Sequence, residues 1–466
     1  MSTPPAPHAA RAHAGKTGRL TQGSTMRHVI EMTVAGSIGL IAVFFVDFLS
    51  LFYISRLKNE YLTAGVGYAV TINFFAISVN VGLMVASSAL VARALGAGDR
   101  DRARRIASTG LILAVLASSA ASVLLLMLAP SALHWLGAEG VPSEVANRFL
   151  LYLLLSNPIM AMQMTLNGLL RSVGDARRAM TVTLTGSIAT ALLDPLFIFG
   201  FGMGTDGAAL ATVCARIIFA VSGWRAVHRH HHLLARPSMA DIRQFVRPLS
   251  DIAGPTVMTN LASPAGSALL LAIVRQFGHE AIAAHTIIDR VVPLAYGVIF
   301  ALSGSVGPIL AQNLGARRFD RVRQTLWNSV VFATFYCLCA WLVLALGRSI
   351  IPEIFGASAR TAEFVSFFCA VGALAWVFNS LLFVANATFN NLGFALYSTL
   401  FNWGRATVGT VPFAYAGAQL AGYQGALAAL VIGWGIFGIS SIIIAFRAIS
   451  GLEKAAGATA DAHQHA

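Results

Sequence analysis

The sequence predicts an all-α membrane protein with twelve transmembrane helices in two pseudo-symmetric six-helix bundles. Three observations support this prediction. Of the 466 residues, 57% are hydrophobic and only 11% are charged, and the mean hydropathy is +0.72, whereas soluble domains carry about 25% charged residues. Uncharged windows of about 20 residues, the length that spans a bilayer, recur along the chain. Finally, motifs of the first half return in the second half.

The six spans predicted in the first half are long apolar stretches. The first follows a tail with Pro, Ala, Gly and His but no apolar block, and its length and internal Asp47 exclude a cleaved signal peptide. The second, third and fourth contain windows of about 20 residues or more without Asp, Glu, Lys or Arg. The fifth and sixth each carry one ionisable residue in their interior, Asp194 and Arg216. The predicted ranges are 29–54, 61–92, 106–129, 145–171, 178–200 and 206–226.

The six spans predicted in the second half follow the same pattern. The seventh, eighth and ninth contain the uncharged windows 252–274, 291–316 and 324–347. From Phe364 to Phe446 the only formal charge is Arg405, and this stretch is long enough for three further spans. The predicted ranges are 249–274, 281–311, 325–347, 363–388, 396–416 and 424–446.

Motifs of the first half recur in the second half at an offset of 219 residues, which indicates an internal repeat. "VARALGAGDRDRARR" (91–105) is echoed by "LAQNLGARRFDRVRQ" (310–324), which pairs Gly96 with Gly315, and "NGLLRSVG" (167–174) is echoed by "NATFNNLG" (386–393). Because six spans is an even number, both halves enter from the same side, as in transporters whose substrate path runs between two repeats. The predicted units are a disordered cytosolic tail (1–28), an N-terminal bundle (29–226), a cytoplasmic linker (227–248), a C-terminal bundle (249–447) and a second disordered tail (448–466).

The distribution of basic residues predicts that both termini face the cytoplasm. Of the 32 Lys and Arg residues, 23 fall in the tails and loops of that side, six in the opposite loops and three within spans. The net charge of +13 is therefore attributed to membrane topology. A nucleic-acid partner is not expected, because the basic residues are scattered over short loops. The histidine-rich run 228–232 is interpreted as one of these positive loops, and we expect no metal site.

Two aspartates lie inside the predicted membrane region of the first bundle. Asp47 and Asp194 are 18 and 16 residues beyond the start of their spans, so at about 1.5 Å per residue they lie at similar depth. Ionisable groups there are costly and are functional candidates. At the repeat offset these positions fall near Gly266 and Val411, so the second bundle has no matching acid. Two neighbouring carboxylates in a low dielectric do not both ionise easily, which suits proton exchange; their oxygens could instead hold Na⁺. The alternative is that each acid only fixes helix packing.

At these motifs the chain resembles the multidrug and toxin extrusion (MATE) family. The resemblance covers nearly the whole chain in the family's order. It rests on "VARALGAGDRDRARR" (91–105), "NGLLRSVGDARRAM" (167–180), "LLDPLFIFG" (192–200), "GAALAT" (207–212) and "AQNLGARR" (311–318). It implies two six-helix lobes in a V shape around a central cleft. It also implies export of amphipathic, often cationic, compounds in exchange for H⁺ or Na⁺ across the bacterial cytoplasmic (inner) membrane.

The chain is most similar to the DinF-like branch of that family, whose cation site lies in the N-terminal lobe. Carried over by position, that site falls on Asp47, Asn167, Asp194 and Thr212. One turn before Asp194 the branch usually has Asn, and this sequence has Thr190. The branch's proline in the first helix is replaced near Met32 and Gly36 by other residues, so a proline-driven bend is not expected. The two acids of the NorM-like branch are absent.

These observations predict a secondary antiporter, not an enzyme, that exports small amphipathic or cationic organic compounds. No cofactor is expected other than the coupling ion, H⁺ or Na⁺. We expect a monomer embedded in the lipid bilayer. The alternatives are a lipid-linked oligosaccharide flippase of the same superfamily and a membrane-embedded transferase. Candidate residues of the substrate cleft are Met160, Met162, Phe197 and Arg405, although Arg405 could instead anchor the second bundle.

Overall fold

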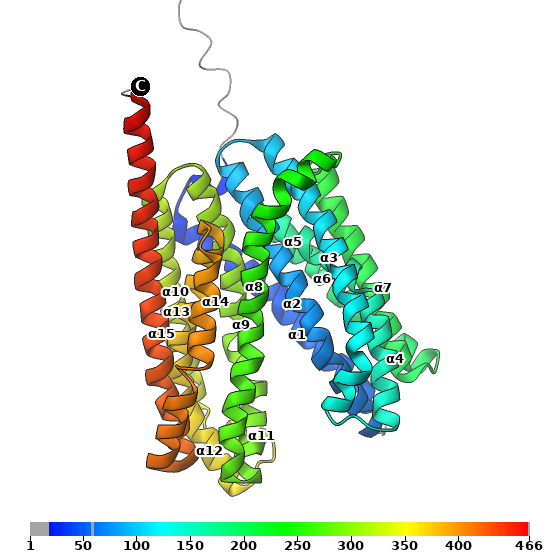
Figure 1. The fold of residues 1–466 in the computed structure, drawn as a ribbon. Coiled ribbons are helices and arrows are strands. Elements are labelled where there is room, and N and C mark those ends of the chain that lie inside the picture. The colour runs from blue at the N-terminus through cyan, green and yellow to red at the C-terminus, as the bar shows by residue number, and fades with distance from the viewer. Residues whose placement is uncertain (1–17, 57–59, 465–466) are drawn as a thin grey trace, which may run out of the picture.

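The computed structural model describes residues 18–56 and 60–464, and every regular element in these ranges is helical (Figure 1). Ten of these segments are long and apolar enough to cross a membrane, and a pair of helices bent by 48° forms an eleventh span. The last apolar segment, Ala395–Ala458, is 64 residues long and contains a chain reversal, so it supplies two crossings. The predicted all-α membrane fold is confirmed.

The first half contains seven α-helices. They are α1 (Thr25–Ser55), α2 (Glu60–Gly96), α3 (Arg100–Trp135), α4 (Val141–Leu155), α5 (Asn157–Ser172), α6 (Ala176–Pro195) and α7 (Gly204–Arg225). Short helical turns precede α1 and follow α6 and α7. They are η1 (Arg19–Thr21), η2 (Leu196–Gly200) and η3 (Ala226–His230).

The second half contains eight α-helices. They are α8 (Met239–Val274), α9 (His279–Gly315), α10 (Phe319–Leu346), α11 (Ile350–Ile354), α12 (Ala359–Ala370), α13 (Ala375–Leu392), α14 (Ala395–Ala406) and α15 (Val411–Gln464). Two short turns, η4 (Arg275–Phe277) and η5 (Gly372–Leu374), adjoin α8 and α13.

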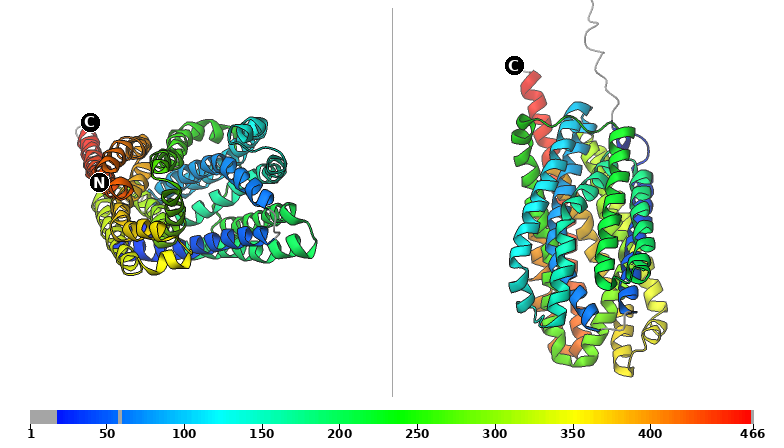
Figure 2. Two further views of the ribbon diagram at one scale, coloured as in Figure 1. Left: turned by 90° about the horizontal axis from the view of Figure 1, so that it is seen from below. Right: turned by 90° about the vertical axis from the view of Figure 1, so that its right-hand side faces the viewer.

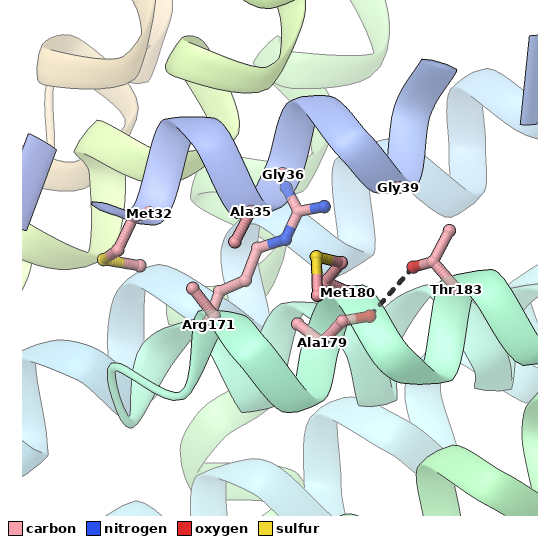
Figure 3. Close-up of a pocket in the computed structure, with 9 residues that line it drawn as sticks. Met32, Ala35, Gly36, Gly39, Arg171, Ala179, Met180 and Thr183 are labelled. Carbon is pink, nitrogen blue, oxygen red and sulfur yellow. Dashed lines mark hydrogen bonds between the residues drawn. The ribbon is translucent and has the colours of Figure 1, made fainter. Parts of the chain in front are cut away.

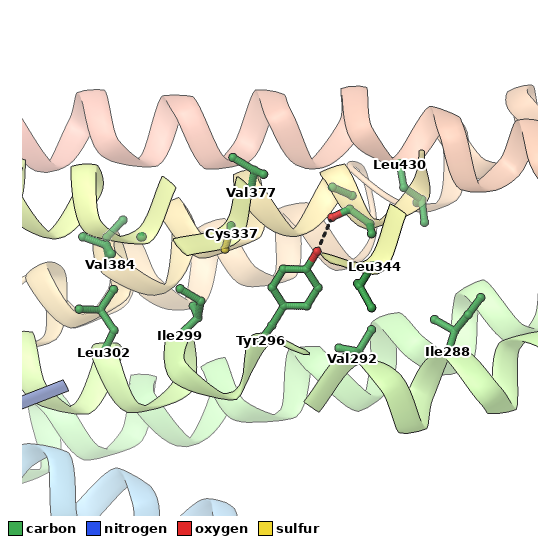
Figure 4. Packing of buried hydrophobic residues seen from close by; sticks show 14 of the residues in the cluster. Ile288, Val292, Tyr296, Ile299, Leu302, Cys337, Leu344, Val377, Val384 and Leu430 are labelled. Carbon is green, nitrogen blue, oxygen red and sulfur yellow. Dashed lines mark hydrogen bonds between the residues drawn. The ribbon is translucent and has the colours of Figure 1, made fainter. Parts of the chain in front are cut away.

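The helices form two side-by-side groups, each with its own apolar core (Figure 2). We call the group built on α2–α7 the N-lobe and the group built on α9–α15 the C-lobe. In the C-lobe core, Tyr296 of α9 is fully buried, and its hydroxyl donates to the Ala373 carbonyl at 3.0 Å (Figure 4). This bond gives the buried Tyr296 hydroxyl the hydrogen-bond partner that a buried tyrosine usually has.

The first helix of the first half begins against the opposite lobe. Val29 and Met32 of α1 belong to the C-lobe core, and Ser305 of α9 donates to the Met32 carbonyl at 3.0 Å. Further along α1, Gly39 packs against Thr183 of α6 in the N-lobe. The α1 helix thus crosses from one lobe to the other, and the predicted bundle 29–226 stays a prediction.

The first helix of the second half makes the matching crossing. Phe245 and Leu249 near the start of α8 belong to the N-lobe core, and Gly266 packs against Ala406 of α14 in the C-lobe. The α8 helix thus bridges the two lobes as α1 does, and the predicted bundle 249–447 stays a prediction.

The repeat-related glycines Gly96 and Gly315 lie at the crossing of α2 and α9. A Cβ atom added to Gly96 would collide with the backbone of Gln312, and one added to Gly315 would collide with the backbone of Arg93. Only glycine permits so close an approach. We call this end of the molecule, where α1 begins and α15 ends (Figure 1), the basic end. The two lobes are in backbone contact there.

Two predicted spans are interrupted. The predicted span 145–171 is the bent pair α4 and α5, because Pro158 has no N–H to donate to Leu154 and its ring crowds that carbonyl. The predicted span 396–416 breaks between α14 and α15, and α15 itself reverses at Ala421 and Gly422, which are non-helical. A Cβ atom on Gly417 would meet the backbone of Gly425, so the two arms of this hairpin lie in contact.

Neither predicted tail is wholly irregular. Residues 1–17 and 465–466 lie outside the described residues, but Leu20 is buried and its N–H donates to Gln312 Oε1 at 2.9 Å. Leu20 thus anchors this stretch on α9. At the other terminus α15 continues to Gln464, helped by an ion pair of 2.9 Å between Arg323 and Glu453. The predicted tails 1–28 and 448–466 are corrected accordingly.

The predicted linker 227–248 is also partly helical. The α8 helix begins at Met239, because the Ser238 hydroxyl accepts from the N–H groups of Ala240 and Asp241 and caps the helix. Before it, the chain crosses the N-lobe and is tied down by Ser108, which donates to the Ala235 carbonyl at 2.8 Å and accepts from its N–H at 2.9 Å.

Candidate ion-coupling site

Asp194 lies at the end of α6, in the interior of the N-lobe, and is 1% exposed. Its Oδ2 accepts a hydrogen bond from the Ser50 hydroxyl of α1. Its Oδ1 is buried and has no hydrogen-bond partner among the described residues. A buried polar atom without a partner is costly. Binding of a proton or a cation to this oxygen would therefore be especially favourable in free energy.

The backbone around Asp194 departs from regular α-helix. Pro195 has no N–H to donate to Ala191, and the next five residues, Leu196–Gly200, form a π-helical turn. Such turns inside helices occur frequently at functional sites. The turn widens α6 directly after the buried carboxyl group.

Asp47 lies on α1, one turn before Ser50, so the two side chains share a helical face. Its side chain is exposed, and its carboxylate is near enough to Asp194 for the two charges to interact. The structure therefore brings Asp47 and Asp194 into one corner of the N-lobe, with Ser50 between α1 and α6. Of these two acids, only Asp194 is buried.

The two threonines predicted for this site bond within their own helices. The Thr190 hydroxyl donates to the Gly186 carbonyl at 3.1 Å, and the Thr212 hydroxyl donates to the Ala208 carbonyl at 3.0 Å. Neither makes a hydrogen bond to Asp47 or Asp194 among the described contacts. The candidate site is thus poorer in convergent oxygens than the sequence pattern suggests.

Asn167 lies away from the two acids, near the basic end of α5. Its Nδ2 donates to the Ala179 carbonyl and to the Thr183 hydroxyl, both at 3.0 Å. The repeat offset places Asn386 and Asn402 at the positions of Asn167 and Thr183, and those two side chains are joined at 2.8 Å. Both lobes therefore share this contact, which supports a packing role for Asn167.

The residues predicted for the cleft do not gather in one place. Met162 packs against the N-lobe core, whereas Met160 is half-buried on the same helix. Phe197 lies in the π-helical turn, with its ring 5.5 Å from that of Phe201. Arg405 lies in the other lobe. Their assignment to the substrate cleft stays a prediction.

Arg405 is 7% exposed in the C-lobe, with its guanidinium 4.7 Å above the ring of Trp434. Its Nε is buried and makes no hydrogen bond within the described part of the chain. The Trp434 ring lies 6.0 Å from that of Trp376, which stacks on Tyr296 at 5.2 Å. The C-lobe thus holds a buried cation beside an aromatic wall.

Sequence reasoning missed Ser50 and Arg171. No pattern distinguishes Ser50 from other small polar residues of apolar helices. Arg171 was counted among the loop charges, but it reaches from α5 toward α1 near Ala35 and Gly36 (Figure 3). Its position in "NGLLRSVG", where the second half has Asn390, is a signal that could have identified it.

Two duplicated helical lobes of membrane-spanning length, with ionisable groups buried inside them, define a multi-pass membrane transporter. The family model MatE matches residues 37–196 and 255–416, one match in each half. The chain belongs to this family. Members are transporters, so the chain is not an enzyme, and the predicted family is confirmed.

The chain is similar to named proteins over most of its length. It is 27% identical to the FAD transporter of Shewanella oneidensis, over 90% of this chain and 94% of that protein. It is 22% identical to the multidrug export protein MepA of Staphylococcus saprophyticus, over 91% of this chain and 94% of that one.

Solved structures share the fold. The MATE transporter VcmN of Vibrio cholerae in its bent form superposes with a TM-score of 0.88 at 22% identity, covering 92% of this chain and 98% of that chain. A MOP superfamily transporter from Pyrococcus furiosus superposes with a TM-score of 0.87 at 22% identity, covering 94% and 99%.

Proposed function

We propose that the protein is a proton-coupled antiporter of the bacterial cytoplasmic membrane that exports small amphipathic organic compounds. The observation that carries this proposal is Asp194, whose buried Oδ1 has no partner while Ser50 of α1 holds its other oxygen. Protonation of Asp194 removes a buried charge and changes the contact between α1 and α6. Since α1 also contacts the C-lobe, a change of charge at this site reaches both lobes.

H⁺ rather than Na⁺ is the proposed coupling ion. A hard cation needs several oxygen ligands around it, and neither the Thr190 nor the Thr212 hydroxyl makes a described contact with Asp47 or Asp194. A proton needs only one unpartnered oxygen. The basic end is proposed to face the cytoplasm, in line with the positive-inside rule, and the protein is proposed to act as a monomer.

The test is transport in proteoliposomes under an imposed proton gradient or an imposed Na⁺ gradient. Asp47→Asn and Asp194→Asn are expected to abolish the response to the proton gradient. Asp289→Asn is the matched control, because the Asp289 side chain is 62% exposed on α9 and its nearest ion-pair partner is His285 at 4.0 Å. Wild-type proton-driven efflux in both acid variants would overturn the proposal.

The C-lobe favours a second substrate class beside cationic drugs. A guanidinium over an aromatic ring, as at Arg405 and Trp434, suits an anionic aromatic compound, and one relative is named for FAD transport. Efflux of FAD and of a cationic dye should be compared in the same vesicles. Transport of FAD that is lost in Arg405→Gln, with dye efflux retained, would establish the anionic class, and dye efflux alone would exclude it.

A further inference from the structure

A groove of about 510 Å³ opens at the basic end between η1, the start of α1 and the start of α6. Its arginines are Arg19, Arg27 and Arg177. The two acids of its lining, Glu31 and Asp175, are each already paired with an arginine, at 2.7 and 2.5 Å. Arg19 and Arg177 are exposed and make no hydrogen bond or salt bridge with a described residue. The groove therefore presents two guanidinium groups that are not ion-paired within the described part of the chain, one of which, Arg177, lies near enough to Glu31 for the two charges to interact.

One wall of the groove is apolar and continues along α1. Ile30, Val34 and Ile38 succeed one another at four-residue spacing and are 41%, 49% and 45% exposed. From Arg27 to Ile38 the helix rises about 16 Å, roughly half the thickness of the hydrocarbon core of a bilayer. The groove thus joins cations at one end to an apolar wall as long as one leaflet.

The groove leads to a smaller pocket that ends at Arg171. The two share Met32, Ala35, Ala176 and Met180 as lining residues. Arg171 extends from α5 toward α1 (Figure 3), and a Cβ atom on Gly304 of α9 would lie 2.5 Å from its Nη1. No hydrogen bond joins the Arg171 guanidinium to the described residues. Arg171 is therefore a third arginine without an ion pair to a described residue, after Arg19 and Arg177, and it lies at the inner end of the groove, where the lobes meet.

The fold itself does not need these arginines. At the repeat offset, Arg171 corresponds to Asn390 and Arg177 to Leu396. Asn390 accepts from the Ser398 hydroxyl at 2.9 Å, so the second half closes the same crossing with neutral residues. The cations belong to one half only, which argues for a ligand and against a packing role.

We propose that this groove binds an anionic phospholipid from the leaflet at the basic end. Arg19 and Arg177 hold its phosphate, as guanidinium groups do well, and an acyl chain lies along Ile30, Val34 and Ile38. A soluble phosphate compound would use the arginines but would leave the apolar wall bare. Because α1 begins on the C-lobe and α6 belongs to the N-lobe, the lipid bridges the lobes at the end where they touch.

Native mass spectrometry of the full chain with added phosphatidylglycerol tests the site. The double variant Arg19→Gln/Arg177→Gln is expected to bind this lipid on the order of thirtyfold more weakly. Each basic residue near a membrane surface contributes a factor of about five to the affinity, and the two factors multiply. The control Arg225→Gln/Arg229→Gln removes two exposed arginines of the α7 end and is expected to bind like the wild type. Phosphatidylcholine is expected to bind more weakly than phosphatidylglycerol.

A second pair of measurements separates a lipid from a soluble phosphate. Val34→Ser/Ile38→Ser leaves the arginines in place and is expected to weaken phosphatidylglycerol binding, and glycerol 3-phosphate is expected not to displace the lipid. Unchanged binding in either double variant of the groove, or equal loss in the control pair, overturns the proposal. Displacement by glycerol 3-phosphate at lipid concentrations would assign the site to a soluble ligand instead. None of these readouts depends on transport.

Discussion

Gly96→Ala tests the backbone contact between the lobes. The added Cβ atom would collide with the backbone of Gln312, which has no flexible end that could move aside. Overpacking costs typically about 1–3 kcal/mol, and a backbone obstacle belongs at the upper end. Replacing a helical glycine by alanine stabilises the helix by up to about 1 kcal/mol, which offsets part of this cost. The expected net loss is about 2 kcal/mol, and the repeat predicts the same loss for Gly315→Ala.

The assay is thermal unfolding of the purified protein in detergent. A loss of that size lowers the melting temperature of a chain this large by roughly 2 °C, because the entropy of unfolding rises with chain length. Gly67→Ala on α2 and Gly254→Ala on α8 are the controls, because an added Cβ atom meets nothing within 4 Å at either position. They should melt at or slightly above the wild-type temperature. If Gly96→Ala and Gly315→Ala melt like the controls, the two lobes are not in backbone contact at this end.

Three further predictions concern single contacts. Trp434→Leu removes the ring beneath the Arg405 guanidinium and should cost on the order of 2 kcal/mol, measured by thermal unfolding, whereas Trp434→Phe should cost less. Ser50→Ala removes the hydroxyl that donates to Asp194 and should slow proton-driven efflux, while Ser50→Thr restores it; equal rates in all three proteins would exclude a role for this contact. Although burial acts to raise it, hydrogen bonds from Arg178 and His231 hold the pKa of Asp175 below its ordinary value. The free energy that these hydrogen bonds add to folding is present above about pH 4 and is lost as the pH falls through the lower pKa of the folded state. The free energy of unfolding of Asp175→Asn, measured against pH, should not show this loss.

Hydropathy predicted the membrane spans well because backbone groups in lipid must bond within their own helix, so each crossing needs one long apolar segment. The repeat offset paired Gly96 with Gly315 as equivalent positions, and the structure places both glycines at one crossing, which the sequence did not predict. Hydropathy also treats a bent span as a continuous one. The bend at Ser156 therefore escaped prediction, even though Pro158 marks it in the sequence.

The sequence did not predict which helices pack against each other. Hydropathy identifies a span without saying which lobe it contacts, so the crossing of α1 and α8 from one lobe to the other was not predicted. The coupling site illustrates the same limit. Matching depth placed Asp47 and Asp194 together, but only packing shows that Ser50 joins the two helices and that Thr190 and Thr212 bond elsewhere.

The two helices that cross between the lobes differ in their proline content. The α8 helix contains Pro248, Pro255 and Pro264, whereas α1 contains no proline over its 31 residues. Sharp helix bends occur at proline and also at Gly/Ser pairs, and α1 carries such a pair at Gly36 and Ser37. In the proposed mechanism, a change of charge at Asp194 acts on α1 through Ser50 and reaches the start of the helix across this pair. The contact between Ser305 and Met32 lies at that start, so α1 joins the buried acid to the opposite lobe.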